Sequence, residues 1–182
     1  LKSWQMVFSG HSPRKRFGQH WLKDDFVLRK IIDAASLEPH DRVLEIGPGK
    51  GALTKGLLAS DASIVHAIEL DKDLIEGLEK RFANNLRFSL SQGDVLSSSL
   101  LPPGGKPANK VVANIPYNIT GPLLGRLLGR LGEPPENRYQ LLVLLVQKEV
   151  ADRIIAKPGH SAFSALSVRL QLLAKCQRVC SV

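Results

Sequence analysis

The sequence predicts a doubly wound α/β fold with a mostly parallel central sheet. Strand and helix patterns alternate along the chain, and the strand patterns are nearly continuous apolar runs, such as QLLVLLV at 140–146. Strands of a parallel sheet read this way because helices cover both of their faces. A glycine-rich segment, LEIGPGKGALT, follows the first such run. Loops of this kind join a strand to a helix in ligand-binding α/β folds.

The expected elements follow in order along the chain. Asp24 and Thr120 are each placed to cap a helix by accepting hydrogen bonds from its first backbone amides. The first helix should turn Phe26, Val27 and Ile31 toward the core. Leucine-rich stretches at 53–58, 74–82 and 123–131, with KEVADRIIA and SAFSALSVRLQLLA, give the other helices. Strands are expected at 42–47, 63–70, 86–92, 110–115, 140–146 and 176–182.

A chain of 182 residues is long enough for one domain with its own core. We expect an N-terminal arm over residues 1–13 and a single domain over 14–182. The stretches at 97–109 and 132–138 are rich in proline, glycine or polar residues and read as loops within that domain.

The net charge of +8 favours a polyanionic partner. Arg14, Lys15 and Arg16 are interleaved with Phe17 and Trp21, a composition that suits phosphates and exposed bases. The same segment is also consistent with a solvated basic arm.

The location of the protein is only partly constrained. The longest aliphatic run, at 141–146, is far too short to cross a bilayer. Cys176 and Cys180 make a poor zinc site, so we expect no metal and read them as thiols of a reducing compartment. The sequence starts at Leu1 without a secretory signal, so a bacterial-type cytoplasm and an organelle reached through a preceding targeting segment are both consistent with it.

The glycine loop gains meaning from two acidic residues at later strand ends. Gly47, Gly49 and Gly51 allow a sharp turn and close approach of a ligand. Glu69 can accept the two hydroxyls of a ribose, and Asp94 can accept from an adenine amino group. Together they describe an adenosine cradle, which NAD and S-adenosylmethionine would both fit. The spacing of the glycines after an acidic residue is more typical of methyltransferases, but a hydride-transfer enzyme stays open at this point.

The segment NIPYNI ends the fourth expected strand beside this cradle. Asn114 offers a side-chain carbonyl that can accept an N–H bond from an exocyclic amine. A backbone carbonyl near Ile115 or Pro116 can accept a second, and Pro116 fixes the turn. Tyr117 presents a flat ring on which an extruded purine can lie.

Five segments, RKRFGQHWL, VLEIGPGKGALT, NIPYNI, QKEVADRI and FSALSVRLQ, occur in this order and resemble the KsgA-type small-subunit ribosomal RNA adenine N6,N6-dimethyltransferase family. The resemblance runs from about residue 14 to the end. It implies a class I S-adenosylmethionine-dependent methyltransferase fold and the dimethylation of two adjacent adenosines in small-subunit rRNA, with a role in ribosome biogenesis. The implied enzyme acts as a monomer on rRNA or the small subunit, and not on a membrane.

Site residues carry over by position. The resemblance implies that Asn114, Ile115, Pro116 and Tyr117 form the catalytic tip. It implies methyl-donor contacts from Gln19, His20, Leu22, Gly47, Gly49, Gly51, Glu69, Asp94 and Asn114.

The chain departs from the family after the strand at 176–182. The family continues beyond this point with a seventh strand and a small helical domain, so we expect the present sequence to be a fragment, a catalytic domain truncated at its C-terminal end. The seventh strand lies between the fifth and the sixth, so we expect residues 176–182 to be frayed or to pair with another chain. We also expect weak methylation by the chain alone.

Two alternatives remain open at this point. The chain could belong to a nucleic-acid-binding transcription or ribosome-assembly factor of the same family with little catalysis. It could instead be an adenine methyltransferase that acts on DNA or confers antibiotic resistance through rRNA.

Overall fold

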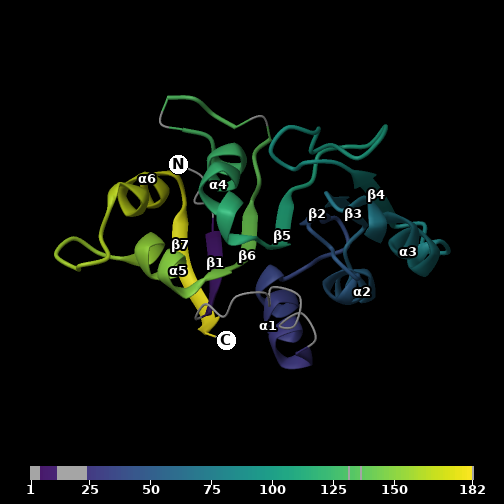
Figure 1. Cartoon of the computed structure of the whole chain (residues 1–182), viewed down its shortest axis with the longest axis horizontal. Coiled ribbons are helices and arrows are strands. Elements are labelled where there is room, and N and C mark those ends of the chain that lie inside the picture. Colours follow the sequence, from purple (N-terminus) through teal and green to yellow (C-terminus); the bar gives the residue numbers. More distant parts are fainter. Residues whose placement is uncertain (1–4, 12–23, 131, 136, 182) are drawn as a thin grey trace.

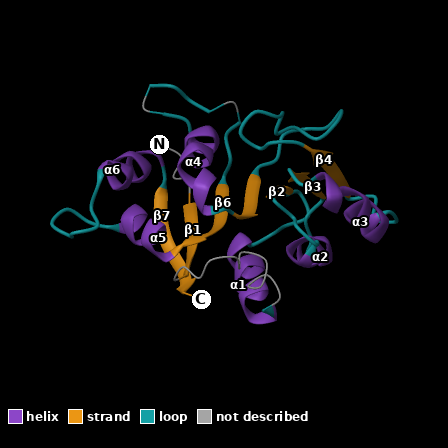
Figure 2. Ribbon diagram, viewed as in Figure 1, coloured by secondary structure: helices purple, strands orange, loops and turns teal. Residues whose placement is uncertain are grey.

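The computed structural model of the chain describes residues 5–11, 24–130, 132–135 and 137–181. Helices pack on both faces of a seven-stranded sheet whose order is β4-β3-β2-β5-β6-β1-β7 (Figures 1 and 2). All strand pairs are parallel. The strands are β1 (Gln5–His11), β2 (Arg42–Ile46), β3 (Ile64–Glu69), β4 (Phe88–Gln92), β5 (Lys110–Asn114), β6 (Leu141–Gln147) and β7 (Lys175–Ser181).

The helices lie between consecutive strands, as the alternating pattern predicts. A 3₁₀ turn, η2 (Tyr117–Ile119), precedes the fourth of them. The α-helices are α1 (Asp25–Ala35), α2 (Ala52–Ala59), α3 (Lys72–Phe82), α4 (Thr120–Leu128), α5 (Lys148–Ile155) and α6 (Ala165–Leu173).

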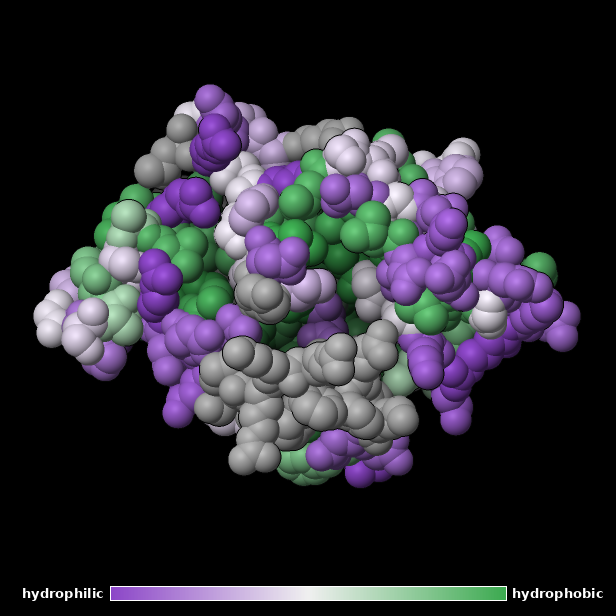
Figure 3. Space-filling view, viewed as in Figure 1, coloured by the Kyte–Doolittle hydropathy of each residue, from purple (hydrophilic) through white to green (hydrophobic). Residues whose placement is uncertain are grey.

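The sheet separates two hydrophobic cores, because successive strand residues point to opposite faces. Val43 of β2 packs with α1 and α2 on one face, with Phe82 of α3 against the same cluster. Leu44, the next residue, packs on the other face with α4, α5 and α6. Hydrophilic side chains gather over α3 at the right of Figure 3, and hydrophobic ones show among hydrophilic ones near α6 at the left, where Val168 and Leu172 are exposed.

The first strand is the main departure from the expected fold. Residues 5–11, placed in an arm by the sequence, form β1 and pair in parallel with both β6 and β7. The expectation that residues 176–182 would be frayed or would need another chain is therefore wrong. The strand β7 has its neighbour within the chain, with one register shift between Phe8 and Ser9. β1 pairs with strands more than 130 residues away, a contact that local periodicity does not reveal.

Two local predictions at helix starts have different outcomes. Asp24 caps α1 as predicted, and its Oδ1 accepts from the backbone N–H of Phe26 at 2.9 Å. Thr120, in contrast, is the first residue of α4, and its hydroxyl donates back to the Pro116 carbonyl at 3.2 Å. The predicted cap at Thr120 is wrong because η2 already supplies the preceding turn.

The apolar face predicted for α1 is nearly right. Val27 and Ile31 are buried and Ala34 is half-buried against the same core, but Phe26 is 57% exposed. The ring of Phe26 lies instead under the ammonium group of Lys30, 5.5 Å from the ring centroid.

A buried ion pair ties three elements together at the amino edge of the sheet. Lys110 begins β5, and its Nζ lies 2.7 Å from Oδ2 of Asp41. The same Nζ donates to the carbonyls of Ala35 and Ser36, at the end of α1. Asp41 also accepts from the Asn109 amide at 2.6 Å. The pair is well satisfied, which is the condition for a buried ion pair to be tolerated.

We expect β7 to depend on residues 5–11. A chain lacking residues 1–11 should lose the hydrogen-exchange protection of the β7 amides, because they would lose their only neighbouring strand in the described sheet. The amides of β3, on the other side of the sheet, are the internal control and should exchange as before. Unchanged protection of residues 175–181 after the deletion would contradict the observed pairing.

The Asp41–Lys110 ion pair should make the stability of the fold depend on pH in the acidic range. Burial alone would raise the pKa of Asp41, but Lys110, the Glu38 amide and Asn109 outweigh it and lower that pKa below 3.8. The contribution of ionised Asp41 to the free energy of unfolding is fully present above the ordinary carboxyl pKa. It is lost as the pH falls through the lowered pKa of Asp41 in the folded state.

We expect Asp41→Asn to cost about 3–5 kcal/mol at neutral pH, because it leaves the charge of Lys110 unpaired. Urea unfolding at a series of pH values measures this. The exposed Asp61→Asn is the control, and the acid-dependent slope should flatten only in Asp41→Asn. An equal slope in both variants would remove the role given to Asp41.

Candidate functional site

The predicted site residues meet at one edge of the sheet. Because all strands are parallel, their carboxyl ends share that edge, where ligands bind in open α/β sheets. Gly47 follows β2, Glu69 ends β3, Asp94 follows β4 and Asn114 ends β5. These four strands are consecutive in the sheet. The structure therefore places the glycine loop between the two acidic residues on one side and the NIPY segment on the other.

The glycine loop needs glycine at each of its three predicted positions. The φ angles of Gly47, Gly49 and Gly51 are +67°, +59° and +78°. A Cβ on Gly51 would lie 2.7 Å from the ring of Phe82, whereas a Cβ on Gly49 would meet no atom within 4 Å. The loop is thus packed where it joins α2 and open at its middle. Open backbone at the end of a buried strand suits close approach of a ligand.

Glu69 holds this loop in place. Its Oε2 accepts from the backbone N–H of Gly49 at 3.0 Å, and its Oε1 accepts from that of Asp71 at 2.9 Å. The residue is 7% exposed. Each carboxylate oxygen has a second lone pair, so the group can still accept from a ligand. Its role in shaping the loop was not foreseen from the sequence.

Glu45 is fully buried under the same loop. Among the described residues, neither of its carboxyl oxygens has a hydrogen-bond partner. Burial raises the pKa of Glu45 to about 8, the nearby Glu69 carboxylate adds to the rise, and Thr54 opposes it. The carboxyl group is therefore mainly protonated at neutral pH.

Asp94 begins a tight turn after β4. Its Oδ1 accepts from the Leu96 N–H at 2.8 Å, and its backbone carbonyl accepts from the N–H groups of Ser97 and Ser98. Gly93, just before it, donates to the Glu69 carbonyl at 2.8 Å and so continues the β3–β4 ladder. The two acidic residues thus stand on directly hydrogen-bonded strand ends.

The NIPY segment is fixed by backbone bonds. Ile115 is buried, and its N–H donates to the Leu145 carbonyl of β6 at 3.0 Å. The Pro116 carbonyl accepts from Ile119 N–H and from the Thr120 hydroxyl, both at 3.2 Å. A Cβ on Gly47 would lie 3.8 Å from the Asn114 carbonyl oxygen, so the segment borders the glycine loop.

One exposed apolar residue at this edge was not singled out from the sequence. Leu70 follows Glu69 and is 68% exposed. An exposed leucine between Glu69 and the capping Asp71 offers an apolar surface at the carboxyl edge. Its only signal in the sequence is an apolar residue set between acidic ones, which is too common to be specific.

Some predicted residues cannot be placed. Gln19, His20 and Leu22 lie outside the described residues. For Tyr117 only the backbone is described, as the first residue of η2.

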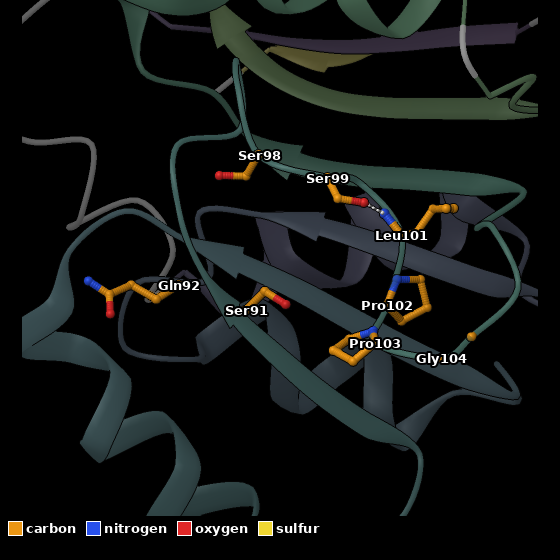
Figure 4. Close-up of a pocket in the computed structure, with 9 residues that line it drawn as sticks. Ser91, Gln92, Ser98, Ser99, Leu101, Pro102, Pro103 and Gly104 are labelled. Atoms are coloured by element: carbon orange, nitrogen blue, oxygen red, sulfur yellow. Dashed lines mark hydrogen bonds between the residues drawn. The ribbon is translucent and has the colours of Figure 1, made fainter.

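A cleft borders the turn that follows β4 (Figure 4). Its volume is about 620 Å³. Serine, proline and glycine residues of the 98–105 loop form one wall, and the end of β4 forms the other. The wall of β4 consists of Ser91 and Gln92.

Metal and membrane features can be assessed for the described residues. No group of His, Cys, Asp or Glu among them could hold a metal ion. No described helix has the length and apolar character to cross a membrane. Cys176 and Cys180 are free thiols of β7, and burial raises the pKa of Cys176 to about 11.

Comparison with known proteins gives consistent results. Residues 10–182 match the model of a family described as ribosomal RNA adenine dimethylase. Over 177 residues, the chain is 68% identical to the ribosomal RNA small subunit methyltransferase A of Prochlorococcus marinus and 66% identical to that of a Synechococcus strain. These matches cover 97% of the chain but 63% of each relative, so the chain spans less than two thirds of their length.

Solved structures agree with these sequence matches. A dimethyladenosine transferase from Plasmodium falciparum is similar with a TM-score of 0.68 and 32% identity, over 80% of this chain and 50% of that one. The 23S rRNA methyltransferase ErmE is similar with a TM-score of 0.58 and 27% identity, over 71% and 49% of the two chains.

Glu45 should make the protein less stable as pH rises. Its folded-state pKa of about 8 lies above its ordinary value of 4.5, so stability should fall between these two values and level off above them. In the unsubstituted chain the free energy of unfolding should fall by about a few kcal/mol over this range. The variant Glu45→Gln should not show this fall, as measured by urea unfolding at a series of pH values. The exposed Glu79→Gln should retain the fall. A flat profile in the unsubstituted chain would refute the raised pKa.

Proposed function

The chain belongs to the ribosomal RNA adenine dimethylase family, and we propose that its whole protein dimethylates N6 of two adjacent adenosines in small-subunit rRNA. The methyl donor is S-adenosylmethionine. The observation that carries this proposal is the order of the strand ends, in which Asp94, Glu69 and the glycine loop follow one another and the NIPY segment comes next to the loop. We also propose that the enzyme works as a monomer in ribosome biogenesis.

The residues at the carboxyl edge suit S-adenosylmethionine better than a dinucleotide. The open backbone at Gly49 leaves room for the donor. The remaining acceptor capacity of Glu69 suits two ribose hydroxyls, and Asp94 suits the adenine amino group. Leu70 offers an apolar surface to the purine ring. When bound, the donor supplies a methyl group on a sulfonium, which is a good leaving group.

The tip residues then act on the acceptor amine. The lone pair of adenine N6 is delocalised into the ring, so the amine is a poor nucleophile. We propose that the Asn114 side-chain carbonyl accepts one N–H bond and localises the lone pair toward the methyl group. The Pro116 carbonyl already accepts two hydrogen bonds, which favours the Ile115 carbonyl as the second acceptor. The amine releases a proton to water after each transfer, and Tyr117 stacks on the base.

The N-terminal residues complete the proposed donor site. Gln19, His20 and Leu22 are proposed donor contacts because of the family resemblance alone. The described residues before and after this segment lie at the carboxyl edge of the sheet. His11 ends β1 at the carboxyl edge, beside Gln147. The end of α1 contacts Lys110 at the opposite edge, so α1 begins on the same side of the sheet as the site.

The relatives point to a bacterial-type ribosome. Those compared are from marine cyanobacterial genera, which fits a bacterial cytoplasm. A chloroplast or mitochondrion carries ribosomes of the same general type, so we include an organelle in the proposed location.

The proposed function is tested by transfer of tritiated methyl groups from S-adenosylmethionine to unmethylated small ribosomal subunits. The protein should be extended to the length of its relatives, and the modified bases mapped. We expect label in two adjacent dimethylated adenosines. Calorimetry on the present chain should show binding of S-adenosylhomocysteine and not of NAD. Tight NAD binding without binding of the methyl donor or its product would overturn the proposal.

Asn114→Ala in the extended protein should abolish methyl transfer while sparing the fold. The loss should reach at least about a hundredfold, because a hydrogen bond that matters in the transition state is removed. Single-turnover rates on small subunits measure the effect, and circular dichroism checks the fold. The exposed Asn84→Ala, in the turn before β4, is the matched control. Near-normal turnover in Asn114→Ala would exclude the proposed role of the side chain.

A further inference from the structure

Arg126 of α4 reaches across to the turn that carries Asp94. One of its terminal nitrogens donates to the Val95 carbonyl, and the other donates to the Ser98 carbonyl at 2.5 Å. Both carbonyls belong to the turn that Asp94 starts. The guanidinium thus binds two points of this turn, a planar two-pronged contact that lysine does not reproduce.

Packing fixes the first part of this turn. Gly93 lies against Ser98 so closely that a Cβ on Gly93 would be 2.3 Å from the Ser98 hydroxyl oxygen. Val95 is 6% exposed and belongs to the core under α4. Beyond Ser98 the chain continues into the loop that lines the cleft of Figure 4, in which Ser99 and Leu101 are exposed and Leu100 is buried in the core. Arg126 therefore fixes the end of the Asp94 turn at the point where this loop begins.

The same helix carries the other half of the site. The NIPY segment continues through η2 directly into α4, and Thr120 bonds back to the Pro116 carbonyl. Arg126 lies less than two turns further along this helix. The helix α4 thus connects the acceptor side of the proposed site to the turn that carries Asp94, through the half-buried side chain of Arg126.

We propose that Arg126 is a positioning residue that aims Asp94 at the adenine amino group of the methyl donor. This inference rests on the proposed function. A helix-end role would not explain the contacts, because a cation in the last turn of a helix interacts with that helix's own carbonyls. The Arg126 donors point instead to carbonyls about thirty residues earlier in the chain.

The test compares two ligands that differ at the edge of the purine that Asp94 would recognise. S-adenosylhomocysteine carries the 6-amino group, and S-inosylhomocysteine carries an oxo group there and a proton on N1. The unsubstituted protein should prefer the amino ligand by about tenfold or more, since the oxo group leaves a carboxylate facing an acceptor. Calorimetry gives the ratio of the two dissociation constants, and Asp94→Asn should abolish the preference.

Arg126→Met keeps the apolar stem and removes both donors. We expect it to reduce the preference to within about threefold while the affinity for the oxo ligand stays near that of the unsubstituted protein. Arg126→Lys should give an intermediate ratio. Arg130→Met removes an exposed arginine close to the end of the same helix and should keep the full preference.

An unchanged ratio in Arg126→Met would overturn the proposal, and so would an equal loss of affinity for both ligands. If Arg126→Met does not fold, Arg126→Lys decides, and a full preference in that variant overturns the proposal. Failure of the proposed function looks different, because the unsubstituted protein would then bind neither ligand.

Discussion

Parallel pairing of every strand is the constraint on which the rest of the structure depends. It sends all carboxyl ends to one edge and all amino ends to the other, so the two edges of the sheet can take different roles. The amino edge holds the Asp41–Lys110 pair, whose polar atoms bond to one another and to the end of α1. The carboxyl edge holds the glycine loop, where backbone is left open.

The two edges differ in how well their buried charges are satisfied. Asp41 has a cation and amide donors, so its ionised form is stabilised. Glu45 is equally buried but forms no hydrogen bond within ordinary geometry among the described residues; Thr54 favours its ionised form, but burial and the nearby Glu69 carboxylate outweigh Thr54. An unsatisfied buried carboxyl group costs stability. Such a cost is consistent with a ligand site, because functional sites often retain groups that lower the stability of the fold.

Much of this arrangement could be predicted from the sequence because it is locally encoded. The strands from β2 to β6 appear as apolar runs, and the positive φ angles of the loop require glycine at positions that the sequence marks. What could not be predicted depends on distant partners. β1 is defined only by β6 and β7, and the contacts of Arg126 join α4 to a turn before β5. Thr120 failed as a cap because a 3₁₀ turn intervenes.

The residues that could be predicted and those that could not have different roles at the proposed site. Motif residues such as Glu69 and Asn114 supply chemical groups, and sequence reasoning can assign groups to strand ends. It cannot show which other side chains fix the angles at which those groups point. Here that information lies in Glu69, which binds the glycine loop, and in Arg126, which connects the helix after the tip to the Asp94 turn. Methyl transfer requires a near-attack geometry, and a misplacement of about 1 Å can cost about a hundredfold in rate. Under the proposed function, a contact that links the acceptor side to the donor side, as Arg126 does, therefore serves the geometry that the motif residues need.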